Sequence, residues 1–429
     1  MSATETRIKT EQLQPGIFIR VEASWFSHPF LFSKFKVKNA DQIQTLKNLG
    51  ITEVYYIPEK SDCLPKMLDR SSAGETQPKM PLPNMQQDPV MQLLWRIKRD
   101  RIEKLKERHE CIRRCTKSYS QTIRRVPAMM SNLVTGSPEA VGEAKEMVSG
   151  MVSIFLADTD ATVHLINIKE KEESLYHHSL NVSVLALTIG KKAGLGSHEL
   201  NCLGIGALFH DIGKNKIDRK ILRKPPPLSK PEIELLQLHP RYGVEIVSQS
   251  GAFPPEALQI ILQHHEQVNG MGYPQRLSRH QISLLSRITA IADEYDNLCN
   301  HPNPDRAMTP YQALSYMYTK RQERLDIELL SSFIRCLGIY PPGTVVRLSN
   351  GMFGIVVSIN PQNPLKPSLM LYDSDVPRAE ALIFDMEDDP DVSIEKSIQP
   401  EKLPSEVRNY LSPSTHLTYF VDDQAPKKT

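Results

Sequence analysis

Two adjacent pairs of ionisable residues give this chain the means for metal chemistry. His210 and Asp211 close one apolar stretch, and His264 and His265 close another one downstream. Imidazole and carboxylate groups together supply the mixed nitrogen and oxygen ligands that divalent transition metals accept. Metals held in this way typically activate a water molecule against a phosphodiester. Seven of the 13 histidines fall between residues 177 and 265, so the candidate ligands are concentrated in one part of the chain.

Three further residues extend this set of candidate ligands, namely His178, His239 and Asp293. His239 follows the apolar segment 233–238, and Asp293 follows 288–292, so both are expected at buried positions of helices. A single histidine in such a place is usually a hydrogen-bonded core residue. Two pairs plus three more ionisable groups favour a shared metal centre instead, because burying such groups without a partner is costly.

The order of these residues resembles a known family. The segments HDIGK, HHEQVNGMGYP and ADEYDNL resemble the HD-type metal-dependent phosphohydrolases, and together they resemble the HD-GYP subgroup. Members of this subgroup are bacterial phosphodiesterases that act on cyclic di-GMP. The resemblance runs from about residue 170 to 320. The segment QLQPGIFIRVEASWFSHPF near the N-terminus is similar to a poorly characterised domain that often precedes HD-GYP domains.

The resemblance implies two divalent metal ions, with iron or manganese expected and nickel as a further choice. The implied ligands are His178, His210, Asp211, His239, His264, His265 and Asp293. Asp211 would bridge the ions, and a hydroxide between them would attack the phosphorus. Lys214 would neutralise a phosphate oxygen, which makes Lys214 and Asp211 the expected catalytic residues. Without the motif, Lys214 could equally complement the dipole at the C-terminus of a helix.

The residues expected to bind substrate are Tyr273, Asp296 and Arg306. Tyr273 belongs to a tight turn with two glycines, and structural and substrate roles carry equal weight for its side chain. Family members usually carry an arginine after the aspartate motif that binds phosphate. His301 and Pro302 occupy that region here, so Arg306 is the nearest basic residue.

Two other departures concern the metal count and the turn. Some family members hold a third metal through a glutamate four residues before the first histidine. Counted from His178 that place is Ser174, and Glu173 would be in register only if His177 were the ligand. We therefore expect two ions rather than three. Asn269 stands where the family's turn usually has an aspartate.

A group of basic residues lies shortly after Lys214. Arg219, Lys220, Arg223 and Lys224 precede a run of three prolines. Such a group either forms a basic rim that attracts a dinucleotide or is part of a solvated loop. The sequence leaves both interpretations open.

The elements that position these residues are predicted to be helical. Apolar residues at i, i+3 and i+4 with Gly and Pro between the segments predict an all-helical HD-type domain at 139–338, which carries the metal centre. The predicted helices are 140–155, 176–193, 199–211, 231–248, 255–265, 283–300, 310–319 and 326–336. The fold class is therefore mainly α.

Smaller parts flank this domain on both sides. Residues 1–57 predict a small α+β module, and 58–90, with six prolines, a linker. Residues 91–138 predict a long basic helix (91–125) and a connector, and 339–429 a short β appendage with a loose acidic and polar tail. The expected strands and short helix are 17–21, 30–37, 40–48 (helix) and 52–57 in the module, and 344–348, 353–359 and 368–372 in the appendage.

Composition limits the partners and the compartment. A net charge of +2 predicts no bulk affinity for a nucleic-acid polymer or a membrane surface. The six cysteines include no Cys-x-x-Cys pair, which is typical of reduced thiols in a cytoplasmic protein. The N-terminus lacks the apolar core of a signal peptide, and no apolar run reaches the ~18 residues of a membrane span. Signalling proteins are conceivable partners, and a homodimer through the long helix stays open.

The leading function implied by the resemblance is hydrolysis of cyclic di-GMP to linear pGpG, with onward cleavage to GMP left open. Two alternatives remain: an HD phosphohydrolase for another cyclic dinucleotide or nucleotide, and a catalytically weak receptor that binds the ligand and signals to a partner. A di-iron oxygen carrier is disfavoured, because such sites use Glu-x-x-His pairs and this chain has none.

Overall fold

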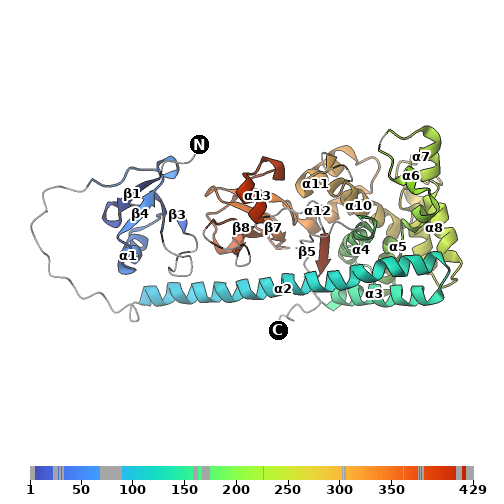
Figure 1. Cartoon of the computed structure of the whole chain (residues 1–429), viewed down its shortest axis with the longest axis horizontal. Coiled ribbons are helices and arrows are strands. Elements are labelled where there is room, and N and C mark those ends of the chain that lie inside the picture. The colour runs from blue at the N-terminus through green and yellow to red at the C-terminus, as the bar shows by residue number, and fades with distance from the viewer. Residues whose placement is uncertain are drawn as a thin grey trace, which may run out of the picture. The chain divides into compact units, whose positions relative to one another are not determined.

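The chain divides into two compact units in the computed structural model. One unit comprises Met1–Glu107 with Asp373–Glu380, and the other comprises Arg108–Tyr372 with Ala381–Thr429 (Figure 1). The structure describes residues 5–22, 28, 30, 33–67, 89–157, 163–166, 174–225, 227–301, 303, 306–360, 362–374, 376, 378, 381–411 and 418–421. Most of the predicted linker, residues 68–88, lies outside the described residues.

The N-terminal module is a four-stranded antiparallel sheet beside one helix. The strands β1 (Thr6–Lys9), β2 (Phe18–Arg20), β3 (Lys34–Lys36) and β4 (Glu53–Tyr56) lie in the order β1-β4-β2-β3, and the helix is α1 (Ala40–Asn48). Asn39 caps α1 by accepting a hydrogen bond from the Gln42 backbone. The α+β prediction is confirmed, but β1 was missed because its sequence TRIK buries only one side chain.

The predicted basic helix is longer than expected. Helix α2 (Pro89–Val134) has 46 residues and includes Pro127, whereas the sequence pattern predicted its end near residue 125. Gly136, at φ +80°, then turns the chain toward α3 (Pro138–Ala157). No helix among the described residues is long and apolar enough to span a bilayer.

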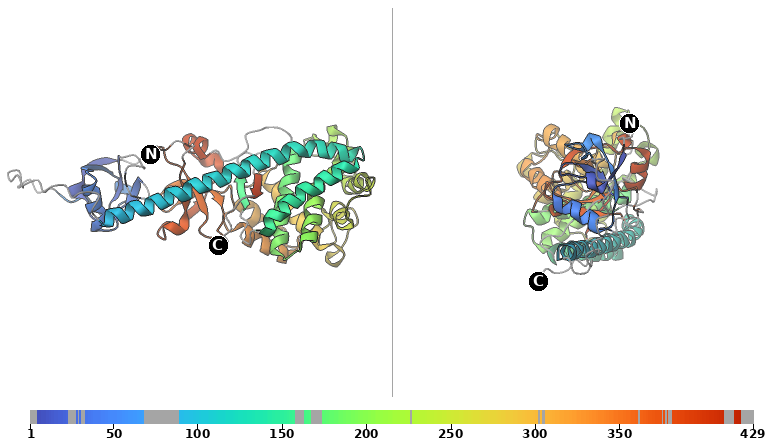
Figure 2. Two further views of the ribbon diagram at one scale, coloured as in Figure 1. Left: turned by 90° about the horizontal axis from the view of Figure 1, so that it is seen from below. Right: turned by 90° about the vertical axis from the view of Figure 1, so that its left-hand side faces the viewer.

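Helix α4 (Ser174–Lys192) is the central helix of the second unit. It packs against α5 (Ser197–Leu208) and α10 (Leu284–Cys299), and α3 lies against α5 (Figures 1 and 2). Every residue from 179 to 187 is buried, so α4 is contacted on all sides. Within two residues at each end, six predicted helices are confirmed by α3, α4, α9 (Pro255–Gln263), α10, α11 (Pro310–Lys320) and α12 (Ile327–Leu337).

Two predicted helices end differently, and both differences affect the candidate ligands. The segment 231–248 forms two helices, α7 (Lys230–Leu236) and α8 (His239–Ser248), because Pro240 fits only the first turn of a new helix. His239 therefore begins a helix instead of closing one. Helix α5 ends at Leu208, so His210 and Asp211 lie in the turn before the 3-10 helix η5 (Ile212–Lys216).

Glycines allow η5 and α8 to approach each other closely. A Cβ atom on Gly213 would lie 1.9 Å from the His239 carbonyl oxygen and 2.4 Å from the Gly243 nitrogen. A side chain at residue 213 would therefore push α8 away. This backbone contact holds His239 beside Asp211.

The C-terminal part forms a five-stranded antiparallel sheet in the order β10-β6-β7-β8-β9. The strands are β6 (Val345–Leu348), β7 (Phe353–Ser358), β8 (Ser368–Leu371), β9 (Ile383–Asp385) and β10 (Ile394–Ser397). The first three confirm the predicted β appendage. The predicted loose tail is wrong, because it supplies β9, β10, α13 (Ser405–Leu411) and β11 (Thr418–Val421). Strand β11 pairs with β5 (Val163–Ile166), just ahead of α4.

Candidate metal centre

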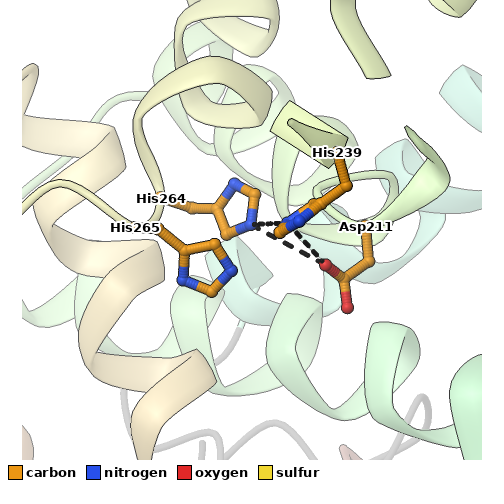
Figure 3. Close-up of side chains that lie close together, drawn as sticks. All are labelled: Asp211, His239, His264 and His265. Atoms are coloured by element: carbon orange, nitrogen blue, oxygen red, sulfur yellow. Dashed lines mark hydrogen bonds and ion pairs between the residues drawn. The ribbon is translucent and has the colours of Figure 1, made fainter. Parts of the chain in front are cut away.

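The fold brings all seven predicted metal ligands to one place in the second unit. His178 lies on α4 and Asp293 on α10, and the others come from the η5, α8 and α9 segments. These side chains are buried, apart from partial exposure of His178 and His265. Figure 3 shows Asp211, His239 and His264 with their polar atoms directed at one another, and His265 next to them.

Asp211 belongs to two groups of candidate ligands at once. One group contains His178 and His210, the other contains His239, His264 and His265, and both contain Asp211. Its Oδ2 atom lies 3.8 Å from Nε2 of His178 and 3.5 Å from Nε2 of His210. Its Oδ1 atom lies 3.3 Å from Nε2 of His239 and 3.7 Å from Nε2 of His264. Each carboxylate oxygen thus faces a different group, as a ligand that bridges two ions must do.

Asp293 also reaches both groups. Its Oδ1 atom lies 3.1 Å from Nε2 of His178 and 3.6 Å from Nε2 of His210. Its Oδ2 atom lies 3.8 Å from Nδ1 of His265. The resemblance implied a bridging role for Asp211 only, whereas the geometry also places a second oxygen of Asp293 toward the other group.

Hydrogen bonds fix the orientation of three imidazole rings. Nδ1 of His210, His239 and His264 lies 2.6, 2.7 and 2.9 Å from the backbone carbonyl oxygen three residues earlier. A carbonyl oxygen can only accept, so each Nδ1 must be the donor. Each Nε2 of a neutral ring therefore turns its lone pair toward the cluster, which is the orientation of a metal-ligating histidine.

The resulting arrangement fits a bound cation. Nε2 of His178 lies 3.3 Å from Nε2 of His210, and Nε2 of His239 lies 3.2 Å from Nε2 of His264. Lone pairs facing each other across such distances repel unless a positive charge lies between them. Oδ1 of Asp211 is also buried without a hydrogen-bond donor among the described residues. A divalent ion in each group would compensate both features, so the donor set fits two ions.

The carboxylates give the centre a strong attraction for positive charge. Burial opposes protonation of His178, but Asp293 and Asp296 outweigh it and raise the pKa of this imidazole to about 10. Burial likewise opposes protonation of His210, whose pKa Asp211 and Asp293 raise to about 9. Burial lowers the pKa of His264 to about 4. A metal that binds through His178 and His210 must therefore displace protons from these rings.

Asp296 contacts the candidate ligand His178. It is buried, its Oδ2 atom lies 2.7 Å from Nδ1 of His178, and its Oδ1 atom accepts from the amides of Asn181 and Asn300. Both oxygens are thus engaged on the side of His178 that faces away from the cluster. In this geometry Asp296 orients a candidate ligand, and its substrate-binding role stays a prediction.

Replacing Asp296 with asparagine is expected to weaken metal binding by about 10- to 100-fold, the range for lost partners of ligating histidines. The amide cannot accept from His178, Asn181 and Asn300 at once, so His178 loses its fixed orientation. Metal titration of the purified variant measures this effect. Glu294→Gln is the matched control, because this carboxylate on the same helix pairs with Arg321. Equal metal affinity in Asp296→Asn and wild type would contradict the orienting role.

A cavity of about 680 Å³ opens beside the cluster. Lys214, His239, His265 and Tyr273 form its wall on the cluster side. Nζ of Lys214 lies 2.5 Å from Oδ2 of Asp211, and the Tyr273 ring centroid lies 4.7 Å from that of His265. Burial raises the pKa of Tyr273, so its hydroxyl stays protonated and can donate a hydrogen bond. The volume is in the range of small-molecule sites.

Arg306 is not among the described residues that line this cavity. It is exposed on the loop after α10, where its backbone N–H donates to the Asn303 carbonyl. Its substrate-binding role stays a prediction. Glu173 lies outside the described residues, so the alternative register for a third metal also stays a prediction.

Sequence reasoning missed the partner of His177. His177 is half-buried, and its Nδ1 lies 2.6 Å from the hydroxyl of Tyr119 on α2. Tyr119 itself is fully buried, and the two rings stack with an interplanar angle of 14°. The contact fixes the start of α4 directly next to His178. Nothing in the local pattern of α2 pointed to this long-range pair.

Glu266 is a second residue that sequence reasoning did not single out. Its buried carboxylate accepts from the backbone N–H groups of Gln275 and Leu277 at 2.6 and 2.9 Å. These bonds close the loop that carries Tyr273. A charged residue directly after two candidate ligands was the available signal, because a buried carboxylate needs such donors.

Comparisons with known protein families divide the chain into three matching parts. Residues 162–329 match the model of the HD domain. Residues 5–144 match a domain of unknown function (DUF3391), and residues 345–406 match a KOW domain associated with HD domain. The HD match covers the segment that holds all seven candidate ligands.

Curated relatives match the chain to different extents. The cyclic di-GMP phosphodiesterase PA4108 of Pseudomonas aeruginosa is 27% identical over 368 residues, which are 85% of this chain and 84% of the relative. The cyclic di-GMP phosphodiesterase response regulator RpfG of Xanthomonas campestris pv. campestris is 34% identical over 36% of this chain and 41% of its own length. The 3′3′-cGAMP-specific phosphodiesterase 2 of Vibrio cholerae is 32% identical over 37% of this chain and 31% of its own length.

Proposed function

Because the chain belongs to the HD-domain metal-dependent phosphohydrolases of the HD-GYP type, we propose that it hydrolyses cyclic di-GMP to linear pGpG. One relative, which matches 85% of this chain and 84% of its own length, is a cyclic di-GMP phosphodiesterase. The observation that carries the proposal is the position of Asp211 between two groups of histidines, beside a cavity that Lys214 lines. Hydrolysis would lower the concentration of the second messenger, and onward cleavage to GMP depends on whether pGpG rebinds.

The residues of the site divide the work of phosphodiester hydrolysis among them. Bound divalent ions would supply a hydroxide nucleophile at neutral pH and polarise the phosphoryl oxygens. Asp211 would hold both ions through separate oxygens. Lys214, whose pKa is raised by Asp211 against the effect of burial, would donate to a phosphate oxygen as negative charge develops. Tyr273 would pack on the substrate from the cavity wall or donate its hydroxyl to it.

We expect about two metal ions per chain, because the ligand atoms form two groups around one shared carboxylate. Iron or manganese is the proposed metal, and nickel is a further choice, since imidazole and carboxylate ligands accept all three. Metal analysis after purification without oxygen tests the number and the identity. A reproducible count near three that falls in Glu173→Ala would show that a third ion binds in the other register.

Relatives with a different substrate define the second candidate function. The Vibrio cholerae phosphodiesterases 2 and 3, both 32% identical over the matched segment, are specific for 3′3′-cGAMP. Metal-loaded protein should therefore be offered cyclic di-GMP, 3′3′-cGAMP and cyclic di-AMP, with chromatography of the products. Faster cleavage of either alternative would overturn the proposed substrate. Tight binding of cyclic di-GMP without any product would show that the protein is a receptor for cyclic di-GMP and not an enzyme.

The remaining proposals concern the setting of this enzyme. The domain division 1–57, 58–90, 91–138, 139–338 and 339–429 stays a proposal, as do a homodimer and signalling partners. A cytoplasmic location is supported by the free cysteines among the described residues, namely Cys63, Cys202, Cys299 and Cys336. Fractionation and size-exclusion chromatography with light scattering test location and oligomeric state.

A further inference from the structure

Two arginines line the cavity on the side contributed by the short helix α6 (Arg219–Leu222). Arg219 opens this helix and Arg223 follows it, so the two are four residues apart and lie on one helix face. Both border the same cavity as Lys214 and Tyr273. The structure thus favours the rim interpretation of this basic segment over the solvated loop for these two residues.

The charges of the two arginines are uncompensated in the part of the chain that the structure describes. Lys224, which also borders the cavity, has its Nζ at 2.6 and 2.9 Å from the Glu232 carboxylate. Neither the Arg219 nor the Arg223 side chain takes part in a hydrogen bond or ion pair with a described residue. Two free guanidinium groups therefore face a space that already contains the Lys214 ammonium.

A cyclic dinucleotide carries two phosphodiesters, and the metal centre with Lys214 can engage only the one that is cleaved. The other phosphate is held by the same small ring, so it must lie within the same cavity. A guanidinium group binds phosphate through two parallel N–H donors. We propose that Arg219 and Arg223 bind the phosphate that is not cleaved. They would then replace the phosphate-binding arginine that family members carry after the aspartate motif, where this chain has only Arg306. This inference rests on the proposed function.

The experiment compares two ligands that share both guanines but differ in the number of phosphodiesters. Cyclic di-GMP has two, whereas the linear dinucleotide GpG has only the one that is cleaved. In metal-loaded full-length protein, Arg219→Ala and Arg223→Ala should each raise KM for cyclic di-GMP by about tenfold, the scale of one charge-assisted hydrogen bond. The kcat for cyclic di-GMP should stay within about twofold of wild type, because the arginines do not touch the reacting phosphate. The inhibition constant of GpG as a competitor of cyclic di-GMP should also stay within about twofold, because GpG lacks the second phosphate.

Lys220→Ala is the matched control. Lys220 lies on the same helix and is exposed, but it does not border the cavity. The same loss of charge should therefore leave the KM for cyclic di-GMP and the inhibition constant of GpG unchanged. Arg219→Lys and Arg223→Lys should recover part of the affinity, because the charge is restored without the paired donors. Unchanged melting temperatures would show that all variants fold, as expected for exposed positions.

Three outcomes would overturn the assignment. An unchanged KM for cyclic di-GMP would show that the arginines do not touch the substrate. An equal loss for GpG would show that they contact a guanine or the cleaved phosphate. An equal rise of the KM for cyclic di-GMP in Lys220→Ala would show that the effect comes from the net charge of this region and not from contacts of the arginines. Failure of the proposed function looks different, since wild type would then cleave bis(p-nitrophenyl) phosphate but not cyclic di-GMP.

Discussion

Asp211→Ala is expected to lower kcat for cyclic di-GMP by roughly 10³-fold or more and to reduce the metal bound per chain, while the fold persists. The scale is that of removing the groups that organise charge in an active site. Asp211 belongs to both groups of ligands, and its two oxygens face different histidines. Losing it therefore disturbs both ions, whereas losing a histidine leaves one group complete.

The buried position of Asp211 requires a second variant. Alanine leaves Lys214 without its partner in a mostly buried place, which also lowers stability. Asp211→Asn keeps the volume but removes the charge and turns one acceptor oxygen into a donor, so activity and metal content can be compared without a cavity at this position. Glu245→Ala is the control, because its exposed carboxylate pairs with Lys216 on the same 3-10 helix. Wild-type metal content and turnover in Asp211→Asn would refute the bridging assignment.

The sequence alone predicted most of the helical domain. It also singled out, as candidate ligands, the seven residues that the fold brings to one place. Helical periodicity between Gly and Pro positions places α9 and α10 to within two residues, because these helices bury one apolar face. The pairs His210–Asp211 and His264–His265 were informative, since buried ionisable groups need a common partner. These features are local, so a single sequence displays them.

The errors arose where distant contacts decide the structure. The break between α7 and α8 depends on Pro240 and on the close contact of Gly213 with the His239 backbone. The ordered tail depends on β11 finding β5 some 250 residues earlier in the chain. The contact of Asp296 with His178 likewise depends on the packing of α10 against α4, which the local sequence does not show.

Lys214→Ala is expected to lower kcat by roughly 10²-fold or more, on the scale of losing one positioned electrostatic group. A lysine that balances charge developing on the phosphate matters more in the transition state than in the ground state, so cyclic di-GMP should still bind. The metal content should also persist, because the lysine contributes no ligand atom. Its pKa is raised by Asp211 despite burial, so it stays charged throughout the usual assay range.

The contact between Lys214 and Asp211 makes the control for this variant important. Lys214→Ala could act through the orientation of Asp211, in which case metal affinity would fall together with kcat. Lys216→Ala removes the same charge from the same 3-10 helix. It breaks an exposed pair with Glu245 and a contact with the Tyr242 ring, and neither partner is a candidate ligand, so kcat and metal content should stay unchanged. A normal kcat in Lys214→Ala would show that this lysine only pairs with Asp211 and has no role in catalysis. A different result would be a wild type that binds cyclic di-GMP but yields no pGpG or GMP with iron, manganese or nickel. That result would show that the protein is a receptor and that Lys214 is a binding residue.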